Sequence, residues 1–319
     1  MNTTYGAISM FTILSLAVCA GADPVALKAE PFATKDVRLL DGPFKDAMQR
    51  DADYLLKLEP DRLLAGFREG AGLPAKAQRY GGWEQQGVAG HTLGHYLSAS
   101  AKMYAATGDD RFRERVAYIV DELGTCQAAN GNGYVAAIPD GKRIFAEIAR
   151  GEIRQKDFEL NGCWVPWYTT HKLMAGLRDA YQLAGCARAK DVLLQLADWA
   201  FATTHALTDE LDQRMLDCEH GGMNEAAADA YAISGDAKYL ALARCFNHRA
   251  IMDPLSAQRD ELSGRHANTQ IPKMTGAARQ YELTGDAYLH DVAAFFWKMS
   301  SAATATVKAL RPKKNSPRR

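Results

Sequence analysis

Four short stretches of the 319-residue sequence combine aromatic residues with histidine, glutamate and amides. They span residues 80–96, 164–172, 219–225 and 264–270. Aromatic faces stack on the C–H surfaces of sugars, while His, Glu, Asn and Gln offer directional hydrogen bonds to hydroxyl groups. A carbohydrate pocket therefore suits these stretches better than a lipid or phosphate site. The candidate ligand contacts are Trp83, His91, His95, Trp167, His171, Glu225, His266 and Gln270.

Several of these residues also have a plainer interpretation. His91 and His95 are four residues apart, as a metal-binding pair on a helix would be, but the glutamate of an H-E-x-x-H motif is missing, so we predict no metal site. Glu219 and Glu225 are of the residue type that hydrolyses glycosides, yet helix N-termini attract glutamate for dipole reasons alone. The position of Gln270 is explained as simply by local helix capping as by contact with a ligand.

A repeated motif indicates which elements position the four stretches. A tyrosine four residues before a glycine recurs at Gly108, Gly185, Gly235 and Gly285, and these glycines are 77, 50 and 50 residues apart. Such a glycine ends a helix in the left-handed conformation, and the aspartate that follows three of the four caps the next helix. Each copy therefore predicts a helical hairpin.

The hairpins predict an all-α fold, with a β pattern only around residues 133–138. Stacked hairpins form either an open solenoid or a closed ring, an α/α toroid. The ring is favoured because the four stretches precede the first helix of each hairpin, so a ring points all of them at one central pocket. Four hairpins, with a fifth from residues 45–64, fall short of the six of a complete toroid.

The ends of the chain differ from its body. Residues 1–22 contain a short apolar run closing on small residues, which predicts a signal peptide and a secreted or periplasmic protein, and the run is too short for a membrane span. Residues 299–319 form a basic tail without an acidic residue, for which we expect disorder. The balance of 38 basic and 38 acidic residues gives no reason to expect a nucleic-acid partner.

The six cysteines are widely spaced and include no C-x-x-C pair, so they indicate neither a zinc ribbon nor a small disulfide scaffold. We expect most of them to be small core residues.

Six stretches together resemble the β-L-arabinofuranosidase family, glycoside hydrolase family 127 and its relatives. They occur in the family's order and cover roughly residues 32–298. The stretches are Leu39 to Phe44, Tyr80 to Glu84, Gly90 to Ser98, Trp164 to Lys172, Gly221 to Glu225 and His266 to Lys273. Each is weak alone, and the set is specific.

The resemblance implies an α/α-toroid catalytic domain that acts on L-arabinofuranosides of plant-derived glycans with retention. It implies that a zinc-held cysteine thiolate is the nucleophile and a glutamate the acid/base. By alignment of the motifs, His171 and His266 fall where the family places histidines that contact the sugar.

The sequence departs from the family after residues 293–298. There the family continues into a Gly-Gly loop that carries the acid/base glutamate, and this chain continues into the basic tail instead. We therefore expect no catalytic residue and no zinc site in this chain, and a glycosidase fragment that is inactive alone. The alternatives are a non-catalytic carbohydrate-binding protein and another α/α-toroid sugar enzyme, an epimerase or lyase that transfers protons through its histidines.

Overall fold

The computed structural model describes residues 24–302, so the predicted signal peptide lies outside the described residues. The helices are α1 (Pro43–Lys57), α2 (Pro60–Gly70), α3 (His91–Thr107), α4 (Asp110–Asn130), α5 (Gly141–Ala149), α6 (Pro166–Gln182), α7 (Ala187–Thr204), α8 (Asp209–Leu216), α9 (Met223–Ser234), α10 (Ala237–Cys245), α11 (Arg249–Ser256), α12 (Ala267–Thr284) and α13 (Ala287–Ala302), with the 3-10 helices η1 (Thr34–Asp36) and η2 (Gly82–Gln85). The strands are β1 (Gln155–Lys156), β2 (Glu159–Leu160) and β3 (Cys163–Trp164), which form an antiparallel sheet in that order. Helix α13 enters the predicted tail, and the tail beyond Ala302 lies outside the described residues.

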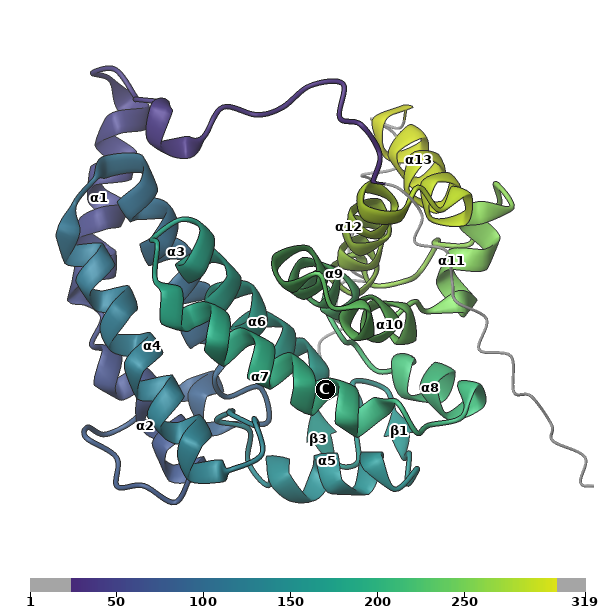
Figure 1. The fold of residues 1–319 in the computed structure, drawn as a ribbon, viewed down its shortest axis with the longest axis horizontal. Coiled ribbons are helices and arrows are strands. Elements are labelled where there is room, and N and C mark those ends of the chain that lie inside the picture. The colour runs from purple at the N-terminus through teal and green to yellow at the C-terminus, as the bar shows by residue number, and fades with distance from the viewer. Residues whose placement is uncertain (1–23, 303–319) are drawn as a thin grey trace, which may run out of the picture.

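Successive helical hairpins build the fold, as the repeat predicts. Their first helices, α3, α6, α9 and α12, lie side by side, and their second helices, α4, α7 and α10, pack outside them. Figure 1 shows the hairpins following one another from α3 and α4 to α12 and α13. Helix α1 lies against α3, and α2 lies against α4. The prediction of an all-α, toroid-like fold is confirmed.

Three of the four turns between paired helices use the predicted glycine as the helix C-cap, whereas α6 ends at Gln182, before Gly185, with Leu183 as its C-cap. Gly108 and Gly235 end α3 and α9 with φ of 73° and 74°, which only glycine adopts without strain. Asp109 and Asp236 then accept hydrogen bonds of 3.0 Å from backbone N–H groups in the first turns of α4 and α10. These caps satisfy N–H groups that a helix start leaves without a partner, so each turn stabilises both helices of its hairpin.

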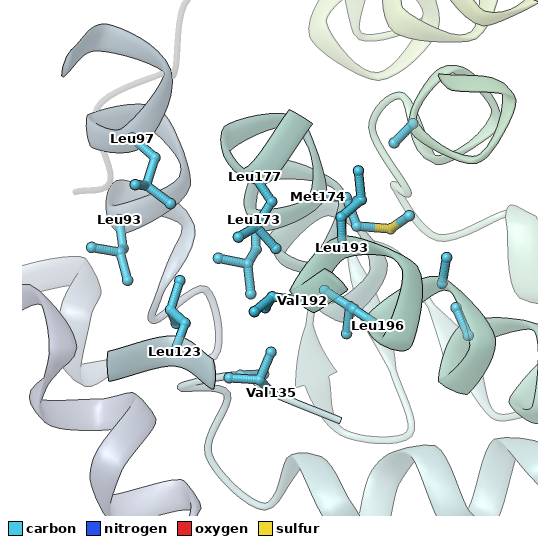
Figure 2. Packing of buried hydrophobic residues seen from close by; sticks show 14 of the residues in the cluster. Leu93, Leu97, Leu123, Val135, Leu173, Met174, Leu177, Val192, Leu193 and Leu196 are labelled. Atoms are coloured by element: carbon cyan, nitrogen blue, oxygen red, sulfur yellow. The ribbon is translucent and has the colours of Figure 1, made fainter. Parts of the chain in front are cut away.

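Apolar side chains from both helix layers fill the space between them (Figure 2). Leu97 of α3, Leu123 of α4, Leu177 of α6 and Leu196 of α7 are all fully buried. A second cluster, which includes Ile251, Met252, Leu255, Met274, Leu289 and Val292, packs α11, α12 and α13 together. No helix in residues 24–302 is long and apolar enough to cross a membrane.

The β pattern predicted around residues 133–138 is wrong, because the described structure has no strand there. These residues run as a buried loop between α4 and α5, and their apolar side chains are 1–6% exposed. The apolar composition therefore reflects burial in the core. The small sheet lies instead in residues 155–164, which carry no alternating pattern long enough to predict it.

Helices α3 and α6 approach so closely that only glycine fits at their contact. A Cβ atom on Gly94 would lie 2.2 Å from the carbonyl oxygen of Lys172, and one on Gly176 would lie 2.6 Å from the carbonyl oxygen of Gly94. Both obstacles are backbone atoms of helices, so they cannot move without shifting the helix to which they belong.

We expect Gly94→Ala to lower the free energy of unfolding by roughly 1–3 kcal/mol, the usual cost of overpacking a core. Gly124→Ala is the matched control, because the new Cβ on α4 would meet only the guanidinium of Arg188, a half-exposed side chain that can move aside. Urea unfolding of both variants measures the difference. Equal stability of the two variants would contradict the close contact.

Candidate functional site

The first helices of four hairpins begin around one cavity of about 620 Å³. Most of its lining comes from the residues that precede or open α3, α6, α9 and α12, so each of the four stretches contributes to one pocket, and Phe158 joins them from the turn between β1 and β2. The lining residues are Trp83, Val88, His91, Phe158, Trp164, Val165, Tyr168, Lys172, Glu219, His266, Asn268, Ile271 and Pro272. Of the eight predicted contacts, this set contains Trp83, His91 and His266.

Exposed aromatic rings form one wall of the cavity. The indoles of Trp83 and Trp164 are 60% and 36% exposed and meet edge to face, with 6.5 Å between ring centroids. Phe158 reaches across from the small sheet to the ring of His266, with 5.9 Å between centroids. Exposed tryptophan faces beside polar groups are the usual composition of a sugar-binding surface.

His91 is held with one ring nitrogen available to a ligand. Its Nδ1 donates a hydrogen bond of 2.8 Å to the carbonyl of Val88, which leaves Nε2 as an acceptor. Glu84 lies behind the ring, with Oε1 3.7 Å from His91 Nδ1 and Oε2 accepting from the N–H of Gly90 at 3.0 Å. Glu84 is 7% exposed, so it supports this wall from beneath the surface.

His95 lies one turn further along α3 and is absent from the cavity lining. Its ring meets that of His91 edge to face, 5.9 Å between centroids. Partial burial, together with the charge of Lys172, lowers the pKa of His95 to about 4, so this ring is neutral near pH 7. Within residues 24–302, no group of three or more His, Cys, Asp or Glu residues is arranged to hold a metal ion.

His171 lies beneath the cavity rather than in its lining. The chain at Gly221 and Gly222 passes directly over its ring, because Cβ atoms there would lie 2.6 Å from Nδ1 and 2.9 Å from Nε2. The histidine is 7% exposed, and burial lowers its pKa well below the ordinary value. A neutral imidazole therefore lies under the loop that precedes α9, and its buried Nδ1 has no hydrogen-bond partner within residues 24–302.

Trp167 is a core residue. Its side chain is 1% exposed and packs against Phe145 and Phe246, with centroids 4.9 and 5.0 Å away. Its indole N–H donates to Met215 Sδ at 3.1 Å. The ring therefore offers no face to a sugar, and the expectation of a stacking role is wrong for this residue. Trp164, three residues earlier, takes the exposed position.

Glu225 and Gln270 are also outside the cavity lining. Glu225 lies in the first turn of α9, where Arg178 Nη1 is 3.4 Å from its Oε1. Burial raises the pKa of Glu225 in spite of that arginine. Gln270, in the first turn of α12, is half-buried and its Oε1 has no hydrogen-bond partner among the described residues.

The structure adds polar residues to the site that the sequence did not select. Glu219 is the only carboxylic acid in the lining, and Lys172 extends over the ring of Tyr168, 5.0 Å from its centroid. Burial lowers the pKa of Lys172. Both residues lie in the predicted stretches. Lys172 is on α6, whose inward face the sequence does not define, and Glu219, which the sequence offers only as a residue type that hydrolyses glycosides, is in the loop before α9. Phe158 lies outside all four stretches and had no such signal.

The described cysteines do not fit a zinc-thiolate site. All five are free and no two are paired. Cys163 and Cys218 precede the lining residues Trp164 and Glu219, but burial raises the pKa of each thiol to about 12. These thiols are therefore protonated near pH 7, and neither belongs to a group of three or more His, Cys, Asp or Glu residues placed to hold a metal ion within residues 24–302.

A buried lysine of α12 contacts the loops that precede α9 and α11 through His248. Lys273 is 1% exposed, and its Nζ lies 2.8 Å from His248 Nδ1. His248 Nε2 lies 3.3 Å from Asp217 Oδ1, so the contact extends to the surface. Burial, assisted by the charge of Arg265, lowers the pKa of Lys273 to about 7.

This lysine predicts a pH dependence of stability. Between about pH 7 and its ordinary pKa of 10.5, the unfolded chain binds the proton more strongly than the folded chain, so the free energy of unfolding rises with pH. We expect the free energy of unfolding of the wild type, relative to that of Lys273→Met, to rise by up to about 1.4 kcal/mol per pH unit above pH 7. Denaturant unfolding from about pH 7 to 9 measures it. Lys57→Met, at an exposed position of α1, is the control and should show no such slope.

These features are typical of one class of protein. Its members are built of helical hairpins in a toroid-like arrangement, and a cavity with exposed tryptophans and polar groups lies where the inner helices begin. The family model described as β-L-arabinofuranosidase, GH127 catalytic domain, matches residues 36–304. The chain therefore belongs to this family, and the resemblance noted in its motifs is confirmed.

Solved structures of the family share the fold. A GH127 β-arabinofuranosidase has a TM-score of 0.57 and 15% identity, over 87% of this chain and 43% of that one. The GH127 β-L-arabinofuranosidase of Geobacillus stearothermophilus T6 has a TM-score of 0.58 and 16% identity, over 82% of this chain and 44% of that one. The chain thus spans less than half the length of these relatives. No curated protein matches the chain significantly by sequence.

Proposed function

We propose that the cavity binds an L-arabinofuranosyl residue of a plant-derived glycan, as the sugar-binding part of a β-L-arabinofuranosidase-type glycoside hydrolase. The observation that carries the proposal is the composition of one cavity, in which exposed tryptophans stand beside His91, His266 and Glu219. Membership of the GH127 family supplies the sugar class. Export by the signal predicted over residues 1–22 would bring the protein to such glycans, and it belongs to the same proposal.

Aromatic and polar residues of the cavity contact different parts of the sugar. The indoles of Trp83 and Trp164 offer apolar faces to the sugar ring. His91 Nε2 and the carboxylate of Glu219 accept hydrogen bonds from hydroxyl groups, and Lys172 donates. This arrangement favours binding over the histidine-based proton-transfer alternative, because His95 and His171 are not in the lining.

We further propose that these residues bind without turnover. Glycoside hydrolysis requires a proton donor and a nucleophile on the two sides of the scissile bond. The cavity lining contains a single carboxylic acid, and the nearby thiols are held protonated. Zinc in the full-length family member would keep a cysteine deprotonated, and the donor set of the described residues does not supply that site.

We expect L-arabinose to raise the Tm of the protein and Trp83→Ala to weaken this binding about tenfold, the equivalent of about 1.4 kcal/mol for a lost stacking contact. Titration calorimetry gives the affinities. Trp297→Ala is the matched control, because this indole is 73% exposed on α13 and outside the cavity. If no pentose binds the wild type, the proposed function fails.

We expect no hydrolysis of an aryl L-arabinofuranoside by the purified chain above the rate without protein. A chromogenic assay over several hours at near-neutral pH measures it. Hydrolysis that disappears in Glu219→Gln would overturn the proposal of binding without turnover and would identify Glu219 as a catalytic acid or base.

A further inference from the structure

A second cavity of about 680 Å³ adjoins the first. The two share Phe158 and Trp164, so these two rings form the ridge between them. Its other lining residues are Gln86, Gly87, Lys156, Asp157, Glu159 and Gly162. It is therefore built by the small sheet and by the segment between η2 and α3, rather than by the starts of the inner helices.

The segment that carries the ridge is held in an unfavourable backbone conformation. Asp157, Asn161 and Val165 have φ of 53°, 53° and 43°, in the left-handed region. For Val165 this is costly, because a β-branched side chain crowds its own backbone there. Such strain persists only where surrounding contacts impose it, and it concentrates at binding sites.

Specific contacts impose that conformation. Asn161 is 3% exposed; its Oδ1 accepts from the N–H of Arg154 and its Nδ2 donates to the carbonyl of Glu152, both at 2.8 Å. The N–H of Val165 donates to the carbonyl of Phe158 at 3.0 Å. These contacts hold the backbone on either side of Phe158 and Trp164 in one conformation, so the two rings project from a defined segment.

The second cavity also offers unused polar groups. Lys156 and Glu159 are opposite each other in the register of β1 and β2, and both are exposed. Neither side chain forms a hydrogen bond or ion pair with another residue of the described chain. The second cavity therefore combines charged side chains with the exposed rings of Phe158 and Trp164. The first cavity also combines polar side chains with exposed rings, so both cavities suit the same class of ligand.

We propose that the second cavity binds the next sugar residue of the same glycan, with Phe158 and Trp164 contacting both residues. The site then recognises at least two linked sugars, and the 155–164 segment sets the preference for longer glycans. This inference rests on the proposed function, because the first cavity must hold the terminal sugar.

The test compares L-arabinose with a disaccharide that carries a terminal L-arabinofuranosyl residue, both titrated calorimetrically into the wild-type chain. We expect the disaccharide to bind at least about tenfold more tightly, a ratio equivalent to about 1.4 kcal/mol. In Lys156→Ala/Glu159→Ala this advantage falls to less than about threefold while the affinity for L-arabinose is unchanged. Lys57→Ala/Asp51→Ala removes two exposed charges of α1 as the control and leaves both affinities unchanged.

Equal affinity of the wild type for the two sugars overturns the second sugar site and leaves the proposed function intact. The same holds if the double variant keeps the full advantage of the disaccharide. If neither sugar binds, the proposed function itself fails, and the second site fails with it.

Discussion

The site depends on the close backbone contact of the inner helices. Where α3 meets α6, Gly94 and Gly176 let the two backbones touch. Where α9 meets α12, a Cβ on Gly276 would lie 1.9 Å from Asn224 Oδ1, and Asn224 Nδ2 donates to the carbonyl of Lys273 at 3.1 Å. With larger residues the helices would separate, and their starts would no longer enclose one cavity. Small residues and one buried amide therefore set the width of the pocket.

Burial also determines the charge state of the groups around the cavity. Burial lowers the pKa of His171 and His248, so both rings are neutral near pH 7, and it lowers the pKa of Lys273 to about 7, so this amine is partly deprotonated there. Each inner helix adds the partial positive charge of its N-terminus at the same place. Neutral nitrogens and free helix N–H groups suit a hydroxylated, uncharged ligand, since neither group requires a counter-ion there.

Local physics explains what could be predicted from the sequence. The Gly-Asp turns act within a few residues, so Gly108 and Asp109 already predict a hairpin. Which face of a helix points inward depends on the neighbouring helices, so the sequence alone predicts a pocket position for Trp167, whereas Trp167 packs in the core and Trp164 is the exposed residue. Lys273 acts through a contact with His248, 25 residues earlier, which the sequence pattern does not reveal, and Phe158 lies in the turn of a sheet too short to show a pattern.

The uneven spacing of the repeat has a structural cause. Two intervals between turn glycines are 50 residues, and the first is 77. The long interval contains α5 and the 155–164 segment, which join the end of α4 to the start of α6 on the side of the molecule where the cavity lies. The turns at the opposite ends of the hairpins keep their short form. The length of this connection can therefore change without disturbing the turns that hold each hairpin together.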